Sequence, residues 1–324
     1  MYPVTAELYQ DPELAVLAPR LQDGDATVRR IAVLDLADLD GEDHVPLLVA
    51  ALDDVAAPVR AEAARALQAF ETPPAVAGLA RLLSDPDDDV RAAAAASLSE
   101  LKQPAAAAQL IPYIGSGDSF VRAAALRGVR ELRLAASFAP ALAALQDGDA
   151  PVRRGAVAVL GYLKQPQALP ALTRIVAADP ALEVRRAAAG ALGFADDGAV
   201  LAALLAALAD DAWQVREEAA TTLGKLRLQD AAPALVAALD DPYWQVRLRA
   251  ARSLGRLRSL HALPGLVAAL EHTISNLRKE AALALGEIGS PLALEALAQA
   301  AGDSDPEVRK SVRLAIGQIG TAAP

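Results

Sequence analysis

The chain is built from short stretches in which apolar residues follow the spacing of an α-helix. From Pro233 to Leu239 the apolar residues fall at i, i+3, i+4 and i+6, and the opening proline needs no donor at a helix start. Asp240-Asp241-Pro242 interrupts this pattern, and a second amphipathic stretch runs from Val246 to Leu257. Two helices are therefore predicted, the second ending near Gly255 to Leu257, where a loop returns the chain.

This pair of stretches recurs with a period of 31 residues. The step becomes 32 once, where Ala177 to Pro180 form a turn that accommodates one extra residue. In each copy the second stretch begins with an apolar residue followed by arginine, and the ten pairs are Val28-Arg29, Val59-Arg60, Val90-Arg91, Val121-Arg122, Val152-Arg153, Val184-Arg185, Val215-Arg216, Val246-Arg247, Leu277-Arg278 and Val308-Arg309.

A fixed period of two short helices predicts an all-α solenoid. One helix pair cannot bury both faces of its small residues, so neighbouring pairs must stack. Hydrophobic residues make up 54% of the chain but aromatic residues only 3%, so the apolar mass is Ala, Leu and Val, which suits close helix packing. We expect a right-handed α-solenoid of about ten two-helix HEAT-like repeats, one domain over residues 1–324 with the terminal repeats as caps.

The repeats carry the pattern D-x-x-x-x-V-R-x-x-A-A-x-x-L-G, as in Asp210 to Gly224 and Asp241 to Gly255. This pattern resembles the bilin-lyase-type (PBS lyase) HEAT-like repeats, and the resemblance covers nearly the whole chain. It implies a solenoid in which the second helices line a concave face. It implies little about function, because the same repeat serves in lyase subunits, adaptors and assembly factors.

Composition and charge exclude several classes of function. Lys and Arg number 31 against 41 Asp and Glu, and this net charge of -10 disfavours binding to nucleic acid. Without cysteine the chain has no disulfide, thiol nucleophile or Cys-ligated metal. Met1 to Glu7 lacks a basic segment followed by an apolar one, and the longest near-apolar stretch, Gly198 to Ala209, is far shorter than the roughly 20 residues of a membrane helix. We expect a cytoplasmic protein without a membrane or nucleic-acid partner.

Aspartate stands five residues before the Val or Leu of the Val-Arg pair in eight copies, and Ser116 and His272 replace it in the other two. Because this Asp and the Arg recur together, we predict a ladder of charge-assisted hydrogen bonds between the turn of one repeat and the helix of a neighbour. The alternative is an anion-binding track formed by the ten arginines. A ladder also predicts that Arg216→Ala costs more than the roughly 1 kcal/mol of an exposed ion pair.

Histidine is the remaining candidate for metal chemistry. His44, His261 and His272 lie in three different repeats, which is too dispersed for a di-iron site. In the ninth repeat Lys279 stands where deoxyhypusine hydroxylases, which are HEAT-repeat enzymes, need histidine. The motifs of nucleotide-binding proteins, zinc proteases and serine hydrolases do not occur. We expect no catalytic residue, no metal and no cofactor.

Side chains that vary while the repeat stays constant indicate a binding surface. Repeats two to four place mostly Ala, Asp and Glu at the predicted outward positions of the second helix, whereas repeats five to eight present aromatic and Arg side chains, which are typical of binding hot spots. Charge follows the same division: residues 1–162 carry 14 basic and 23 acidic side chains, and residues 163–324 carry 17 and 18. The predicted partner-binding residues are Tyr162, Phe194, Trp213, Trp244, Arg249, Arg252 and Arg256.

Some of these residues also have a purely structural interpretation. Trp213 and Trp244 occupy the same position one repeat apart, so they are expected side by side, and each would pack on the following repeat if the fold favours tryptophan there. Tyr162 and Phe194 follow glycine at the ends of their helices and would fill a tight junction between repeats. The sequence leaves both interpretations open.

The predicted function is that of a non-catalytic scaffold, adaptor or assembly factor that binds a partner protein in its concave face. The alternative is a bilin-lyase-like subunit whose groove holds a tetrapyrrole. Its propionates would then meet Arg249, Arg252 or Arg256, and its rings would meet Trp213 and Trp244.

Overall fold

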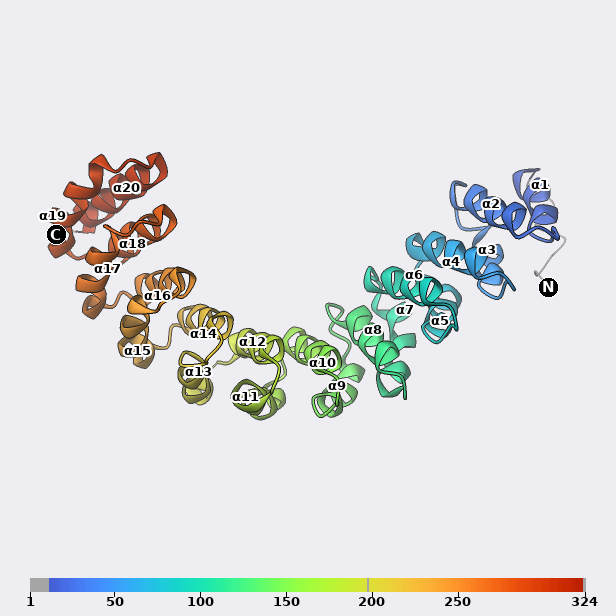
Figure 1. Cartoon of the computed structure of the whole chain (residues 1–324), viewed down its shortest axis with the longest axis horizontal. Helices are drawn as coiled ribbons and strands as arrows, with labels where there is room; N and C mark the ends of the chain where they lie inside the picture. Colours follow the sequence, from blue (N-terminus) through green and yellow to red (C-terminus); the bar gives the residue numbers. More distant parts are fainter. Residues whose placement is uncertain (1–11, 197, 323–324) are drawn as a thin grey trace. The chain divides into compact units, whose positions relative to one another are not determined.

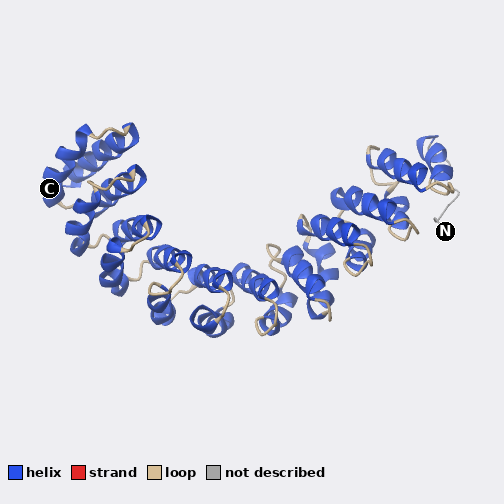
Figure 2. Cartoon of the chain, viewed as in Figure 1, coloured by secondary structure: helices blue, strands red, loops and turns tan. Residues whose placement is uncertain are grey.

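Paired helices make up the part of the chain that the structure, a computed structural model, describes: residues 12–196 and 198–322 (Figure 2). These residues contain twenty α-helices joined by turns and short 3-10 segments, and no strand. The helices form ten consecutive pairs, which confirms the predicted all-α solenoid of two-helix repeats. The expectation based on Met1 to Glu7 concerns residues outside this range.

The chain divides into two compact units, Met1–Leu163 and Lys164–Pro324. The first helices of the five pairs in the first unit are α1 (Pro12–Arg20), α3 (Val45–Ala51), α5 (Pro73–Leu82), α7 (Pro104–Ala107) and α9 (Phe138–Ala144). Their second helices are α2 (Ala26–Ala37), α4 (Ala57–Ala66), α6 (Asp88–Ser99), α8 (Ser119–Val129) and α10 (Ala150–Leu163).

The second unit repeats this arrangement. Its first helices are α11 (Leu169–Ala178), α13 (Leu201–Ala207), α15 (Ala232–Ala237), α17 (Leu263–Ala269) and α19 (Leu294–Gln299). Its second helices are α12 (Leu182–Ala191), α14 (Trp213–Leu226), α16 (Trp244–Leu257), α18 (Ser275–Ile288) and α20 (Pro306–Ala322). The expected helix from Pro233 to Leu239 is an α-helix only to Ala237, because its last turn tightens into a 3-10 segment, Ala238–Asp240.

Within the second unit, α12, α14, α16, α18 and α20 pack on one another in chain order, and the first helices lie on their other side (Figure 1). We call these five helices the second-helix layer. Apolar side chains fill the space between the two layers, and Val215, Ala219 and Leu223 of α14 are fully buried. The small residues allow the helices to approach closely, as the alanine content predicts.

The second helix of this repeat, α16, ends at Leu257, within the expected range. Gly255 lies inside α16, and the residue that leaves the helix in the left-handed conformation is Arg258, with φ 51°. Gly255 instead faces α18, where an added Cβ would come within 2.9 Å of the Ala284 Cα atom. Glycine at this position therefore allows close packing between repeats rather than the turn at the helix end.

Candidate functional site

The Arg and Asp residues of the repeat form the predicted ladder. In six repeats the arginine Nε and Nη2 atoms donate to both oxygens of the aspartate 25 residues further on, in the next repeat, at 2.7–3.0 Å. The six pairs are Arg29–Asp54, Arg60–Asp85, Arg122–Asp147, Arg185–Asp210, Arg216–Asp241 and Arg278–Asp303. The ladder is confirmed, and these arginines are not available as an anion-binding track.

Each ladder arginine also stabilises the turn of its own repeat. Arg216 Nη1 donates to the carbonyls of Asp210 and Asp211, and Asp241 Oδ1 also accepts from the Tyr243 backbone N–H. The side chains of Arg216 and Asp241 are only 12% and 10% exposed. A buried bidentate pair with every polar atom bonded gives each junction one defined geometry.

The ladder is interrupted at the two positions where the sequence lacks aspartate. Arg91, which would pair with residue 116, instead bonds Asp88 in its own helix and lies over the Phe120 ring, 5.7 Å from the centroid. Arg247, which would pair with residue 272, donates to the Asp241 carbonyl. His272 Nδ1 accepts the Ile274 backbone N–H at 3.0 Å, the turn bond that aspartate makes elsewhere.

Two of the three predicted arginines are engaged in ion pairs between repeats. Arg249 Nε donates to Glu217 of α14 at 3.0 Å, and Arg252 forms two bonds with Glu280 of α18, at 2.8 and 2.6 Å. The side-chain hydrogen bond with Glu280 raises the pKa of Arg252 further. Arg256 is exposed, with no ion pair among the described residues. Carboxylates of neighbouring repeats therefore balance the charges of Arg249 and Arg252.

The second residue after the ladder arginine was predicted to face outward, but its side chain faces the preceding repeat. Glu62 and Glu280 occupy this position and are buried. Glu218 occupies it in α14, and its Oε2 atom lies 3.9 Å from Arg186 Nε in the preceding repeat. Burial raises the pKa of the Glu218 carboxyl, and the nearby Arg186 guanidinium opposes this shift. Arg249 occupies the same position with the charges reversed, so its first role is to join α16 to α14.

An aromatic cluster lies where α14 and α16 begin. The Trp213 ring stacks on Tyr243, with ring centroids 5.5 Å apart and planes 16° from parallel. The Arg216 guanidinium lies over the same tyrosine ring, 5.6 Å from its centroid. Tyr243 is 45% exposed, whereas Trp213 and Trp244 are partly buried. We call Trp213, Tyr243 and Trp244 the aromatic end.

Tyr243 was missed in the sequence prediction. It precedes α16 at a position where most repeats have Asp or Ala, so its departure from the repeat is a signal that the sequence contains. Trp213 packs on Tyr243 of the following repeat, which agrees with the prediction that this tryptophan packs between repeats. The two indole rings do not stack on each other among the described residues. The aromatic end therefore contains rings that pack on each other and remain partly exposed to solvent.

The other two predicted residues lie apart from the aromatic end in the chain. Tyr162 is near the end of α10 in the first compact unit and is 39% exposed, so it does not fill a core junction within that unit. Phe194 ends the 3-10 segment Leu192–Phe194 after α12 and is partly buried. The site that the described contacts define is therefore confined to α14 and α16.

Basic residues gather at the opposite ends of these two helices. Lys225 and Arg227 stand at the end of α14, and Arg256 and Arg258 at the end of α16. All four are exposed, and none forms an ion pair with a carboxylate in the part of the chain described, although the charge of Lys225 acts on the nearby Glu218 and opposes the rise of its pKa. We call these four residues the basic end.

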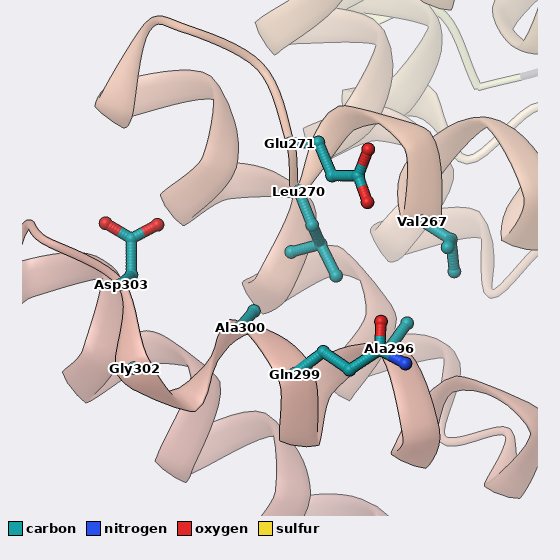
Figure 3. A pocket seen from close by; sticks show the side chains of 8 residues that line it. All are labelled: Val267, Leu270, Glu271, Ala296, Gln299, Ala300, Gly302 and Asp303. Atoms are coloured by element: carbon teal, nitrogen blue, oxygen red, sulfur yellow. The ribbon is translucent and has the colours of Figure 1, made fainter.

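Other features of the described residues offer little for chemistry. No group of three or more His, Asp or Glu side chains is placed to hold a metal ion, and no helix is both long and apolar enough to cross a bilayer. A pocket of about 270 Å³ lies between α17 and α19, walled by Val267, Leu270 and Ala296 (Figure 3). Of its two carboxylates, Glu271 and Asp303, the second is held by Arg278.

Stacked helix pairs joined by a repeating ion-pair ladder define an α-solenoid repeat protein. The chain belongs to the HEAT-repeat family, which confirms the resemblance seen in its Val-Arg pattern. The model of this family, described as HEAT repeats, matches residues 14–99, 48–130, 77–145, 107–193, 138–224, 176–244, 201–273 and 232–317.

Solved structures share this fold at low sequence identity. YibA of E. coli is 22% identical with a TM-score of 0.55, over 92% of this chain and 99% of that one. Kap95p, from a study of its binding to RanGDP, is 14% identical with a TM-score of 0.67, over 97% of this chain and 51% of that one.

The complex of CpcE and CpcF of phycocyanin lyase from Nostoc is also similar. It is 25% identical over 68% of this chain and 95% of that one, with a TM-score of 0.45. This likeness is too low to support a statement about activity. No curated protein matches the chain.

Proposed function

We propose that this protein is a non-catalytic scaffold that binds a partner protein on the second-helix layer of Lys164–Pro324, part of the expected concave face. The observation that carries the proposal is the aromatic end. Its residue Tyr243 is 45% exposed, although aromatic side chains are costly to leave in water and are typical of binding hot spots.

The repeat itself does not require these aromatic side chains. The residue equivalent to Trp213 is Ala57 in α4, Asp88 in α6 and Ser275 in α18, and each of those helices begins at that residue. This variation supports a function other than folding for the two tryptophans. Kap95p, a protein of similar fold, binds another protein, which agrees with a scaffold role.

The ion pairs change how the proposal is tested. Replacing Arg249 or Arg252 leaves Glu217 or Glu280 without a partner and destabilises the solenoid, so those variants do not isolate binding. We would instead compare Trp213→Ala, Trp244→Ala and the double variant with Ser119→Ala. Ser119→Ala is a matched control because it alters the equivalent position, at the start of α8 in the other compact unit.

The experiment begins with affinity capture from the native cell and mass spectrometry, followed by binding measurements with the purified partner. We expect each tryptophan variant to weaken binding by about 2 kcal/mol or more if its ring is a hot spot. The melting temperature should stay close to that of the Ser119→Ala control.

Two results would count against the scaffold on this surface. The first is a large drop in melting temperature with capture intact in the folded fraction, which would make both rings packing residues only. The second is a visible absorption band after incubation with a bilin or haem, which would favour the lyase-like alternative.

A further inference from the structure

The aromatic end and the basic end occupy opposite ends of the same two helices. In α16 the residues Trp244 and Arg256 are twelve positions apart, which corresponds to about 18 Å along the helix axis. The step of twelve residues turns the side chain by about 120° around the axis, so Trp244 and Arg256 lie on adjacent sides of α16 rather than on one line. Because Tyr243 and Arg256 are both exposed, one ligand that crosses α14 and α16 obliquely would reach both ends.

The repeat accounts for only part of the basic end. Arginine or lysine next to the end of a helix stabilises its dipole by about 0.3–1 kcal/mol, and a basic residue with left-handed backbone recurs at the position of Arg227 and Arg258, as Arg133 and Lys164. Lys225 and Arg256 depart from the repeat, because the equivalent residues are Glu131 and Glu287. A cation in place of glutamate on two consecutive repeats, in a chain of net charge -10, therefore indicates a surface for anions.

The surface between the two ends is polar and locally neutral. The pairs Arg249–Glu217 and Arg252–Glu280 cross it, each cation being balanced by a carboxylate. A helical ligand would need an apolar strip along its whole length, which this surface does not provide. An extended segment suits it, because its backbone forms hydrogen bonds with polar side chains while its ends supply the specific contacts.

We infer that the segment of the partner that binds here is extended and acidic, with one aromatic or large apolar residue about five or six residues from a cluster of Asp or Glu. The spacing follows from about 18 Å divided by the roughly 3.3 Å that each extended residue covers. The apolar residue contacts the aromatic end, and the carboxylates contact the basic end. This inference rests on the proposed function and adds the chemistry of the ligand to it.

The test uses synthetic peptides rather than the native partner. The test peptide carries one Phe, a spacer of five Gly and Ser residues, and four Glu, with both termini blocked. Binding to the full chain is followed by tryptophan emission, because Trp213 and Trp244 are the two tryptophans of the sequence. We expect the peptide to bind at least about tenfold more tightly than versions with Ser for Phe or Lys for Glu, and more weakly as salt rises.

Protein variants test the same contacts from the other side. Arg256→Glu with Arg258→Glu should weaken binding at least about fivefold, since each exposed charge pair contributes up to about 1 kcal/mol. The matched control is Arg133→Glu, which alters an exposed residue with the same left-handed backbone, φ 52°, in the other compact unit. Glutamate at residue 256 is compatible with the fold, because Glu287 occupies the equivalent position in the next repeat.

Several outcomes would overturn the inference. If the peptide with Lys for Glu binds as tightly as the test peptide, the basic end does not contact the ligand. If a peptide with a spacer of one residue binds as tightly as the test peptide, the ligand does not contact both ends. A clear optimum near twelve spacer residues indicates a helical ligand instead. If native capture depends on Trp213 and Trp244 but not on Arg256 and Arg258, the scaffold function stands and this inference fails; if it depends on neither pair, both fail.

Discussion

At the scale of single residues, the ladder arginine bonds through three of its nitrogens at once. In Arg216 the Nε and Nη2 atoms bind Asp241, and Nη1 binds the two carbonyls of the turn that precedes α14. Only a planar guanidinium presents donors in this fork, so lysine would not replace it. The Val-Arg pair recurs in the sequence because six junctions use this geometry, and Arg91 and Arg247 keep the bond to the turn carbonyl even where the aspartate is missing.

The first prediction concerns the interrupted rung at His272. His272→Asp gives Arg247 the bidentate carboxylate that six other arginines have, while keeping the turn bond to the Ile274 N–H. We expect the free energy of unfolding to rise by about 1 kcal/mol or more, measured by urea denaturation. His261→Asp, at an exposed residue outside the ladder, serves as the control. If His272→Asp lowers the free energy of unfolding, a bidentate ion pair at this junction does not stabilise the protein.

The second prediction concerns acid. The hydrogen bond from Arg122 lowers the pKa of Asp147, and the bond from Arg278 lowers that of Asp303. A carboxyl whose pKa is lower in the folded state binds fewer protons there, so its stabilising effect is complete above about pH 4 and is lost as the pH falls through its folded-state pKa. Urea midpoints should therefore drop between about pH 4 and pH 2. Asp147→Asn should lower stability near neutral pH and flatten this acid dependence, and an unchanged slope would contradict it.

At the scale of elements, glycine sets how closely neighbouring second helices pack. An added Cβ at Gly255 would lie 2.9 Å from the Ala284 Cα atom, so Gly255→Ala should push α16 and α18 apart and cost about 1–3 kcal/mol. Gly317 in α20 has no such neighbour within 4 Å, and Gly317→Ala should gain about 0.5–1 kcal/mol from helix propensity. Thermal unfolding compares the two. If both substitutions stabilise the protein, close packing at Gly255 is not needed.

The elements also show what the sequence predicts and what it does not. The helix pairs and the ladder follow from the period, because identical residues at one spacing must make identical contacts. The partners of Arg249 and Arg252 do not follow from it. Glu217 and Glu280 lie 32 residues before and 28 residues after their arginines, and which of them meet depends on how adjacent helices face each other. Opposite charges at facing positions of neighbouring repeats were the signal that could have revealed the first pair.

At the scale of the whole molecule, the described helices pack mainly on those of the same or the adjacent repeat, so damage to one junction should remain local. Arg216→Ala leaves the buried Asp241 carboxylate unpaired and should cost about 3–5 kcal/mol. We expect faster amide hydrogen exchange in α14 and α16, with little change in α2 and α4. Equal acceleration in both compact units would mean that the chain unfolds as one cooperative body.

The two interrupted rungs have a consequence for the protein under tension. When a chain of similar repeats is pulled from its two ends, the junctions between repeats open one at a time. Each repeat of 31 residues that unfolds releases roughly 100 Å of chain. The joints after Arg91 and Arg247 lack the bidentate pair, so they should open at the lowest force in an optical-tweezer trace. His272→Asp should remove one of these early events. The position of a single aspartate would thus decide which junction between repeats opens first under tension.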